Sequence, residues 1–363
     1  MNPCPGVREE LNSYSGQTGC RNVQDDGEET SYLTRTDVCS LFVTYNPDLG
    51  EFHEALLRAT DGSRYIVIVD NTTNPATQVA IESLIKDVSK RLQQCGAHID
   101  FHLLTLGENR GLSTAYNNGI AKARELKARF ILLLDQDSLL APGAIGSLVK
   151  RWIQMGDRVR IGAISCTNIE EVNVNVGLEP IVSKLAAYRG HRAGGASVRS
   201  QMGPIREARL FTNSGTMIAL DSWGQAGPFN ILLFLDAIDY DYSMRLRTMG
   251  FKLFIAEDIS IRHRQGRYVS RRFLGFKMNL RTYPPSRSYW IVRDTLLFAS
   301  LWFRRYPREV ISILLRQMSG TFGAMLLLDE RRERGRLVLK AISDFGHRWD
   351  RAAGLAVHVP LRP

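Results

Sequence analysis

Between residues 39 and 134 the chain alternates short, mainly apolar segments with longer stretches of helical periodicity. The apolar segments are Cys39–Tyr45, Tyr65–Val69, Ile99–Leu104 and Phe130–Leu134. The stretches between them cover about 49–58, 76–94 and 113–127, and we expect Ser113 to cap the last of these helices. Buried strands separated by helices in this way are typical of a parallel sheet covered on both faces. The sequence therefore predicts an α/β fold.

Each of these predicted strands ends in polar or acidic residues. The strand ends carry Thr44 with Asn46, Asp70 with Asn71, Asn109 with Gly111, and Asp135 with Asp137. In open α/β sheets, ligands bind beyond the carboxyl ends of the strands. One such end could simply begin a turn, but four in succession predict a ligand-binding rim.

The last of these strand ends, Asp135-Gln136-Asp137, has a pattern suited to a divalent cation. Two carboxylates two residues apart can face one hard cation, which prefers oxygen ligands and often keeps a diphosphate as its partner. The alternative is that the segment starts a turn and caps a helix beginning near Pro142. The buried strand before it and the other polar strand ends favour the cation site.

A second acidic cluster lies in the segment 234–242, with a helix predicted from Ile238 onward. Asp241 and Arg245 are spaced for a pair along that helix. Asp239 at the helix start could act as a general base near a metal-bound diphosphate. His263 follows a further predicted strand end; a lone histidine is usually structural, but a neutral imidazole is also a common metal ligand.

The positive charge of the chain is concentrated in its C-terminal part. The net charge is +10, and residues 262–363 carry 21 Lys and Arg against 7 Asp and Glu. A basic surface can serve nucleic acid, anionic lipid or a phosphorylated substrate, and charge alone does not choose among them. No charge-free apolar run reaches the ~18 residues of a membrane span, the best being Gln317–Leu328.

Several other classes of protein lack support in the sequence. There is no P-loop, no dinucleotide-binding glycine motif after the first strand and no nucleophile elbow. The five cysteines form no C-x-x-C pair, so we predict neither a zinc site nor a disulfide framework and expect a cytoplasmic compartment.

Taken in order, the motifs resemble those of the family 2 glycosyltransferases, which have the GT-A fold. They are LFVTYNP, VIVDNT, ENRGLSTAYNNGI, ILLLDQDS, NSGTMI, FLDAIDYDYSMRLRTMG and IRHRQG, within Cys39–Gly266. The DQDS form, the FLDAIDYDY form and the later RSYWIVRD segment (287–294) look like the rhamnosyltransferase branch. The resemblance implies an inverting, metal-dependent transfer, most simply of L-rhamnose from dTDP-L-rhamnose.

The resemblance also implies roles for individual residues. Nucleotide and donor contacts would come from Thr44, Asn46, Asp70, Asn109, Gly111, Asp135, Asn213 and Gly215. Asp137 and His263 would hold Mg²⁺ or Mn²⁺. Asp239 would be the catalytic base, with Asp236 as the alternative because Ile238 stands where many relatives have Glu. A glycine at 215 would allow a ligand to approach closely.

Three regions follow from this interpretation: a poorly ordered tail (1–37), a GT-A catalytic domain (38–266) and a basic, mainly helical segment (267–363). The stretch Arg189–Arg209 is predicted to be a mobile loop. The C-terminal segment would contact an anionic membrane or the pyrophosphate of a lipid-linked acceptor, or would simply pack on the domain. The acceptor implied is a cell-surface polysaccharide such as an O-antigen, made on the cytosolic face of the inner membrane.

Two alternatives to a rhamnosyltransferase remain. One is a family 2 enzyme that moves another sugar, such as galactofuranose or glucose. The other is a module that binds a nucleotide sugar or nucleic acid without turnover, although no known nucleic-acid reader motif is present.

Overall fold

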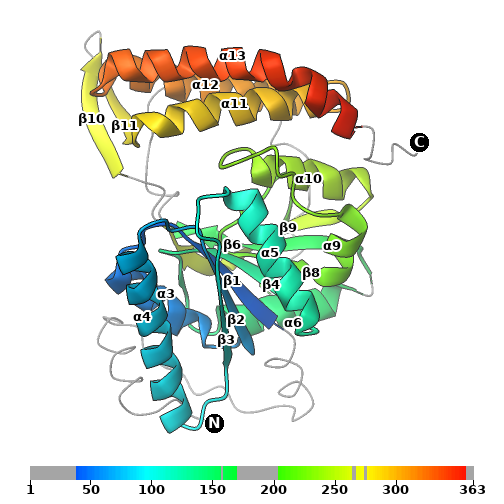
Figure 1. Cartoon of the computed structure of the whole chain (residues 1–363). Coiled ribbons are helices and arrows are strands. Elements are labelled where there is room, and N and C mark those ends of the chain that lie inside the picture. Colours follow the sequence, from blue (N-terminus) through cyan, green and yellow to red (C-terminus); the bar gives the residue numbers. More distant parts are fainter. Residues whose placement is uncertain (1–37, 157, 170–202, 264–266, 274–275, 357–363) are drawn as a thin grey trace.

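The computed structural model of the protein describes residues 38–156, 158–169, 203–263, 267–273 and 276–356. Its first half alternates strands and helices in the predicted order (Figure 1). The elements are β1 (Val38–Thr44), α3 (Leu49–Ala59), β2 (Tyr65–Asp70), α4 (Pro75–Gln94), β3 (Asp100–Thr105), α5 (Leu112–Glu125) and β4 (Phe130–Asp135). The predicted tail 1–37 lies outside the described residues.

The second half of the sheet domain departs from the simple alternation. It contains β5 (Leu139–Leu140), α6 (Ala144–Gly156), β6 (Ile161–Asn168), β7 (Ile205–Ala208), β8 (Thr216–Ala219), α9 (Leu220–Ala226), α10 (Ile238–Thr248) and β9 (Lys252–Arg262). The strand order is β3-β2-β1-β4-β8-β6-β9-β5, with β7 paired to β9. Strands β1 to β4 pair in parallel, and so do β6 and β9, whereas β8 runs antiparallel to its neighbours β4 and β6. The sheet is thus mostly parallel, as expected.

Two apolar cores lie on opposite faces of this sheet. Strand residues such as Phe42 and Ile66 pack with α3, α4 and α6 on one face. Their neighbours along the strands, including Leu41 and Val67, pack with α5, α9 and α10 on the other. Because successive side chains of a strand point to opposite faces, a strand covered on both sides must be apolar throughout. This explains the uninterrupted apolar runs in the sequence.

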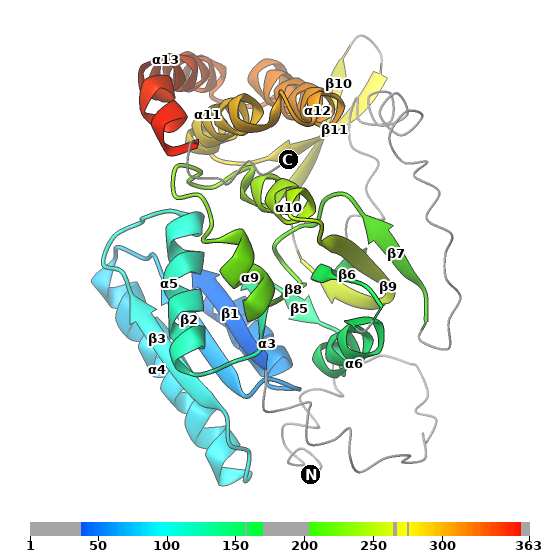
Figure 2. The same cartoon turned by 90° about the vertical axis from the view of Figure 1, so that its right-hand side faces the viewer.

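The C-terminal segment forms a separate layer above the sheet domain (Figures 1 and 2). It begins with a hairpin, β10 (Arg267–Phe273) and β11 (Phe276–Thr282), followed by α11 (Pro285–Trp302), α12 (Pro307–Leu327) and α13 (Arg331–Ala356). A third apolar cluster joins this layer to α10 through Met244, Phe298 and Trp302. The Trp302 indole also donates a hydrogen bond to the buried Asp241 carboxylate, 2.8 Å away.

Several local predictions were wrong. Ser113 does not cap α5; the N-cap is Gly111, and the Ser113 hydroxyl is buried with no hydrogen-bond partner among the described residues. Of the predicted mobile loop Arg189–Arg209, the part up to 202 lies outside the described residues, and 205–208 form β7. Cys95 is disulfide-bonded, although the cysteine spacing predicted no disulfide framework, while Cys39 and Cys166 are free and buried.

Helix α12 bears on whether the C-terminal segment could contact a membrane. Among the described residues it is the helix whose length and apolar composition would suffice to cross a membrane, with a mean hydropathy of 1.4 in its best window. The sequence argument required a run without charges and so rejected this stretch, which includes Arg316. Length and composition are weak grounds, since core helices of soluble proteins also satisfy them.

Candidate active site

The ends of β1 and β2 form a compact polar corner. The Thr44 hydroxyl donates to Asp70 Oδ1 over 2.8 Å, and the backbone N–H of Thr72 donates to the same oxygen over 3.1 Å. Asn46 adopts φ 46° and donates its backbone N–H to the Thr72 hydroxyl over 2.9 Å. Asp70 is 1% exposed, and its Oδ2 has no hydrogen-bond partner among the described residues. A buried carboxylate oxygen left over in this way is suited to accept hydrogen bonds from a ligand.

The turn after β3 forms a hydrogen bond to the segment after β2 and packs against Phe234. Asn109 Oδ1 accepts the backbone N–H of Gly111 over 3.1 Å, and Asn71 Oδ1 accepts that of Arg110 over 3.2 Å. Gly111 has φ 83°, and a Cβ there would lie 2.6 Å from a ring carbon of Phe234. Glycine is therefore needed here so that the segment around Phe234 can pack against the start of α5.

The end of β4 meets the end of β9. His263 Nε2 lies 3.2 Å from Asp135 Oδ2, and His263 Nδ1 lies 3.0 Å from Asp137 Oδ1. Burial alone would lower the pKa of His263, but the hydrogen bond to Asp137 and the charge of Asp135 raise it above its ordinary value. Burial raises the pKa of Asp135, and the charge of the neighbouring His263 opposes this rise. The predicted partners of the cation site are therefore brought together.

These three side chains have suitable chemistry for Mg²⁺ or Mn²⁺, because carboxylate oxygens and an imidazole nitrogen are ligands for such ions. In the described part of the chain, however, no group of three or more His, Cys, Asp or Glu side chains has the arrangement of a metal site. Both ring nitrogens of His263 face carboxylate oxygens instead. Holding a cation would require at least one of these contacts to be exchanged.

Residues 213–215 lie beside Asp135, at the end of β4. Ser214 and Ser138 share a hydrogen bond between their hydroxyls, and the Ser138 hydroxyl accepts the backbone N–H of Asp135 over 3.0 Å. Asn213 Oδ1 is buried with no hydrogen-bond partner among the described residues. Gly215 has φ 78°, but a Cβ there would meet Ile261 at 3.0 Å. Packing against Ile261 therefore already requires a glycine at 215, and its predicted role in the approach of a ligand stays a prediction.

The second acidic cluster lies at the start of α10, as the sequence predicted. Burial raises the pKa of Asp239 to about 7; the Asp236 carboxylate adds to this rise, whereas the Tyr240 backbone N–H, 3.0 Å from Asp239 Oδ1, opposes it. Burial also raises the pKa of Asp236, opposed by the charge of Arg287. The Asp241–Arg245 pair is confirmed, at 2.5 Å along the helix. A carboxylate with a pKa near neutrality is suited to accept a proton.

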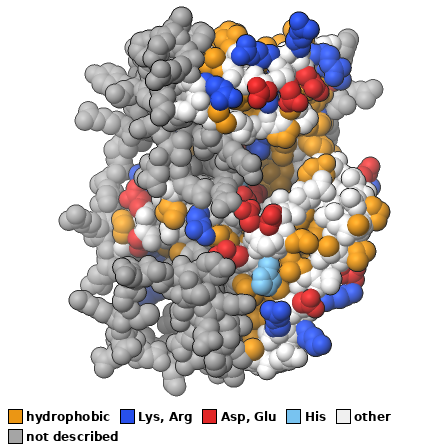
Figure 3. Space-filling model, turned by 90° about the vertical axis from the view of Figure 1, so that its left-hand side faces the viewer, with side chains coloured by type: hydrophobic (Ala, Val, Ile, Leu, Met, Phe, Trp, Pro, Cys, Tyr) orange, Lys and Arg blue, Asp and Glu red, His pale blue; other side chains and the backbone are white. Residues whose placement is uncertain are grey.

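Residues of the C-terminal layer that the sequence left without a role face these acids. Arg287 Nε lies 3.9 Å from Asp236 Oδ2, and its charge also acts on Asp135. Arg316 donates to the Tyr240 hydroxyl. Figure 3 shows a recess between this layer and the sheet domain, with acidic side chains at its lower edge. The basic character of the segment was visible in the sequence, but which arginines reach the acids depends on how the layer packs.

Tyr116 of α5 is a further side chain that the motifs did not single out. Its hydroxyl is fully buried and has no hydrogen-bond partner among the described residues. Burial raises the pKa of Tyr116 well above its usual value, and the charges of Asp135 and Asp239 raise it further. The Tyr116 hydroxyl is therefore close enough to both acidic clusters for the charge of each to raise its pKa.

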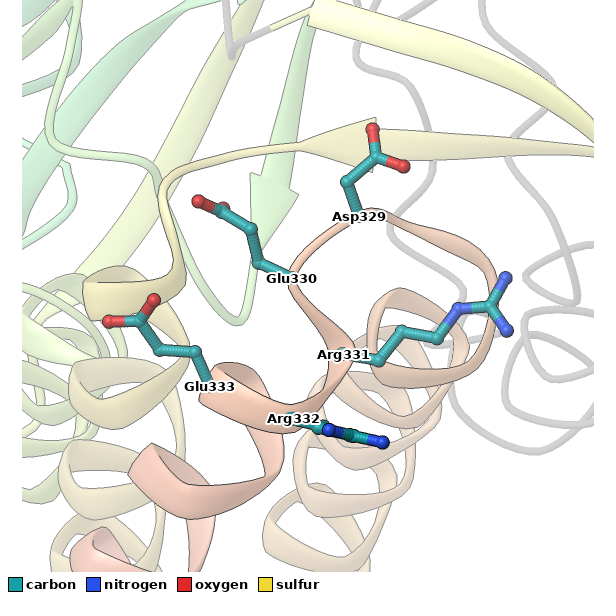
Figure 4. A pocket seen from close by; sticks show the side chains of 5 residues that line it. All are labelled: Asp329, Glu330, Arg331, Arg332 and Glu333. Carbon is teal, nitrogen blue, oxygen red and sulfur yellow. The ribbon is translucent and has the colours of Figure 1, made fainter.

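A surface hollow elsewhere has no connection to this chemistry. It lies at the turn between α12 and α13 and is lined by five successive charged residues, Asp329, Glu330, Arg331, Arg332 and Glu333. All five are exposed, and their side chains point in different directions (Figure 4). They do not converge on one point as a binding site would.

The sheet and the helices that cover it form a fold of the GT-A type. Two solved structures share the fold at a TM-score of 0.50. One is the mannosyltransferase PcManGT from Pyrobaculum calidifontis in complex with GDP-Man and Mn²⁺, 15% identical, covering 94% of this chain and 85% of that one. The other is GalNAc-T7 with UDP, GalNAc and Mn²⁺, 13% identical, covering 94% of this chain and 62% of that one.

The sequence comparisons name the family. Residues 41–206 match the sequence model of glycosyl transferase family 2, so this segment is a family 2 glycosyltransferase segment. The chain is also 24% identical over 266 residues to the dTDP-rhamnosyl transferase RfbF of Shigella flexneri, covering 72% of this chain and 79% of that protein. The resemblance stated from the motifs is confirmed, and the rhamnosyl relative is a distant one.

Proposed function

We propose that this protein is an inverting, metal-dependent glycosyltransferase that moves L-rhamnose from dTDP-L-rhamnose to a growing cell-surface polysaccharide or lipid-linked glycan. The observation that carries the proposal is that two acidic clusters of the GT-A domain, one around Asp135 and Asp137 and one around Asp236 and Asp239, share a charged neighbour, since Arg287 acts on both Asp135 and Asp236. The likeness to a dTDP-rhamnosyl transferase supports rhamnose over galactofuranose or glucose.

In this proposal the base is Asp239, which takes the proton of the attacking acceptor hydroxyl. Its position at the first turn of α10 favours the carboxylate, while burial keeps its pKa at about 7 and so keeps it basic enough to accept a proton. Asp236 is the alternative base, but Arg287 lies 3.9 Å from its Oδ2 and favours its charged form. Inversion by direct displacement needs no enzyme nucleophile.

The nucleotide is assigned to the corner formed by Thr44, Asn46 and Asp70. The Asp70 Oδ2, which has no hydrogen-bond partner among the described residues, would accept hydrogen bonds from the base or ribose, and the turn at Asn109 and Gly111 would lie beside the phosphates. Asn213, whose Oδ1 is buried and unpaired among the described residues, would orient the donor sugar.

Asp137 and His263 would hold Mg²⁺ or Mn²⁺ beside Asp135. The bound cation would stabilise the charge that develops on the departing nucleoside diphosphate. Both structural neighbours were solved with Mn²⁺, which supports a divalent metal. His263 would have to release at least one carboxylate, and both carboxylates lie within 3.2 Å of its ring.

The test is a donor screen with the full chain and Mn²⁺. Nucleoside diphosphate release is compared for dTDP-rhamnose, UDP-galactofuranose, UDP-glucose and GDP-mannose, with Asp137→Ala and, as a matched control, the exposed Asp221→Asn on α9. We expect selective release from dTDP-rhamnose that Asp137→Ala abolishes and Asp221→Asn retains. Release from another donor would overturn the rhamnose assignment. Silence with every donor and acceptor preparation, together with nucleotide binding, would indicate a binding module.

We further propose that the protein works at the cytosolic face of the membrane, where α12 touches anionic lipid. The large apolar side chains of α12 exposed to solvent are Ile311, Leu315, Phe322 and Leu326, between 39% and 61% exposed. Their spacing places them on one face of the helix, opposite the buried Val310, Ile313 and Ala324.

Exposed arginines lie next to this apolar face, at 304, 305 and 308 before and within the first turn of α12. Apolar side chains with flanking basic groups suit the surface of an anionic bilayer. Sedimentation with phosphatidylcholine vesicles, with and without phosphatidylglycerol, tests this contact. Phe322→Glu should lose binding to the anionic vesicles, whereas Val79→Glu, 65% exposed on α4, should keep it. Binding that ignores lipid charge or survives Phe322→Glu would refute the contact.

A further inference from the structure

We propose that Asp294 is a positioning residue for the glycosyl transfer proposed above, on which this inference rests. Its carboxylate belongs to α11 of the C-terminal layer and fixes the loop of residues 234–236 that leads into α10. This loop carries Asp236 and sets the position of Asp239. The C-terminal layer would therefore be part of the catalytic machinery.

The first step in the argument is the set of hydrogen bonds to one oxygen. Asp294 Oδ2 accepts the backbone N–H groups of Phe234, Leu235 and Asp236 at 3.0, 2.9 and 3.1 Å. The side chain of Asp294 is 0% exposed. Three successive N–H groups turned toward one point need a strong acceptor, since the loop has no strand or helix partner for them.

The second oxygen of the same carboxylate is neutralised by its neighbour in the chain. Arg293 donates Nε and Nη2 to Asp294 Oδ1, at 2.8 and 2.5 Å. Arg293 Nη2 also donates to the carbonyl of Leu232 over 2.9 Å, so the arginine holds the loop one turn earlier. Burial raises the pKa of Asp294 to about 6, and the charge of Arg293 opposes that rise.

Ring stacking adds a further contact between α11 and the loop. Phe234 stacks on Trp290 with ring centroids 3.9 Å apart and planes inclined by 15°. The Arg293 guanidinium lies over the Trp290 ring, 4.4 Å from its centroid. The segment RSYWIVRD, which the sequence singled out without a role for its members, thus supplies every one of these contacts.

The loop is held on its other side by the nucleotide-binding half of the domain. The carbonyl of Phe234 accepts the backbone N–H of Leu112 over 2.7 Å, and its ring fills the space beside Gly111. Ala237 then takes the left-handed conformation, φ 60°, immediately before α10. A loop fixed between α11 and α5 and followed by such a bend has little freedom. Its release would move Asp236 and the first turn that bears Asp239.

The test compares Asp294→Ala and Asp294→Asn with the control Asp344→Ala. Asp344 of α13 accepts hydrogen bonds from Tyr289 and Lys340 of the C-terminal layer, so its loss tests the packing of that layer. We expect Asp294→Ala to lower kcat about a hundredfold, the scale of a 1 Å misplacement, with donor KM changed less than about threefold. Asp294→Asn should fall between Asp294→Ala and the wild type, because its amide oxygen can still accept the three N–H groups while its NH2 group cannot accept from Arg293. Asp344→Ala should keep kcat.

Hydrogen exchange of the backbone amides of residues 234–236 measures how firmly Asp294 holds this loop, and it requires no turnover. These amides should be protected in the wild type and in Asp294→Asn, and exchange fast in Asp294→Ala. Full kcat in Asp294→Ala, a parallel loss of nucleotide binding and kcat, or fast exchange in the wild type would each overturn the proposal. Protected amides in a wild type that turns over no donor would refute the proposed function, and the positioning role with it.

Discussion

The raised pKa of Asp239 makes a quantitative prediction about the pH dependence of turnover. Asp239 is flanked by the Asp236 carboxylate, which disfavours its charged form, and by Arg316 and the Tyr240 backbone N–H, which favour it; burial dominates and raises its pKa to about 7. A group with that pKa is about one tenth ionised at pH 6 and about nine tenths ionised at pH 8. If the ionised form is the base, kcat/KM, which reports the ionisation of the free enzyme, should rise about tenfold between these values and then level off.

The assay is nucleoside diphosphate release at donor and acceptor concentrations well below saturation, from pH 5.5 to 9, with constant ionic strength. Asp236→Asn removes a neighbouring negative charge and should move the midpoint to lower pH. Asp239→Asn should remove the rise together with most of the rate. A flat profile in the wild type, or the same rise in Asp239→Asn, would refute the assignment of the base.

The same pKa has a consequence for stability, with the opposite dependence on pH. In the unfolded chain the carboxyl has its ordinary pKa of 3.8, whereas burial raises the pKa to about 7 in the folded protein. Between these values the folded state binds more protons, so Asp239 lowers stability as pH rises, by a few kcal/mol in total above pH 7. The melting temperature of Asp239→Asn should therefore gain on that of the wild type between pH 4 and pH 8. A constant difference in thermal melts would contradict this reasoning.

Three further predictions follow from packing and metal chemistry. Gly111→Ala would put a Cβ 2.7 Å from the Phe234 carbonyl at φ 83°, and should cost about 2–5 kcal/mol in denaturant unfolding and lower kcat as well. Gly119→Ala would put a Cβ 2.2 Å from Leu41 Cδ1, and should cost about 1–3 kcal/mol but leave kcat per folded molecule unchanged. EDTA should abolish turnover and Mn²⁺ restore it, except in Asp137→Ala; turnover that resists EDTA would argue against a metal.

Local sequence patterns predicted the first half of the fold closely. Helix α4 was expected at 76–94 and spans Pro75–Gln94, because its boundaries are set by Asn74 as cap and by an amphipathic repeat. The start of α10 at Ile238 was predicted from the spacing of its residues, without a capping side chain, since its N-cap is Ala237. The antiparallel insertion of β8 between β4 and β6 was missed, since strand partners far apart in sequence leave no local signal.

In the candidate site, too, residues with a local sequence signal were predicted, and residues whose contacts lie far away in the sequence were missed. Residues at strand ends, such as Asp70 and Asp135, were predicted because the topology of a parallel sheet gathers its carboxyl ends. The role of Asp294 was not predicted, because its three hydrogen bonds reach 58 to 60 residues back along the chain. Gly215 was assigned to the ligand, but only the packed sheet reveals that Ile261 occupies the space beside it.

The most direct test of the central claim is the turnover of Asp239→Asn beside a measurement of its nucleotide affinity by calorimetry. The account predicts a loss of about 10²- to 10⁴-fold in kcat with the preferred donor, while nucleoside diphosphate affinity stays within about threefold of the wild type and Asp221→Asn behaves as the wild type. Wild-type turnover in Asp239→Asn, or a loss of kcat matched by an equal loss of nucleotide affinity, would contradict a general base at this position.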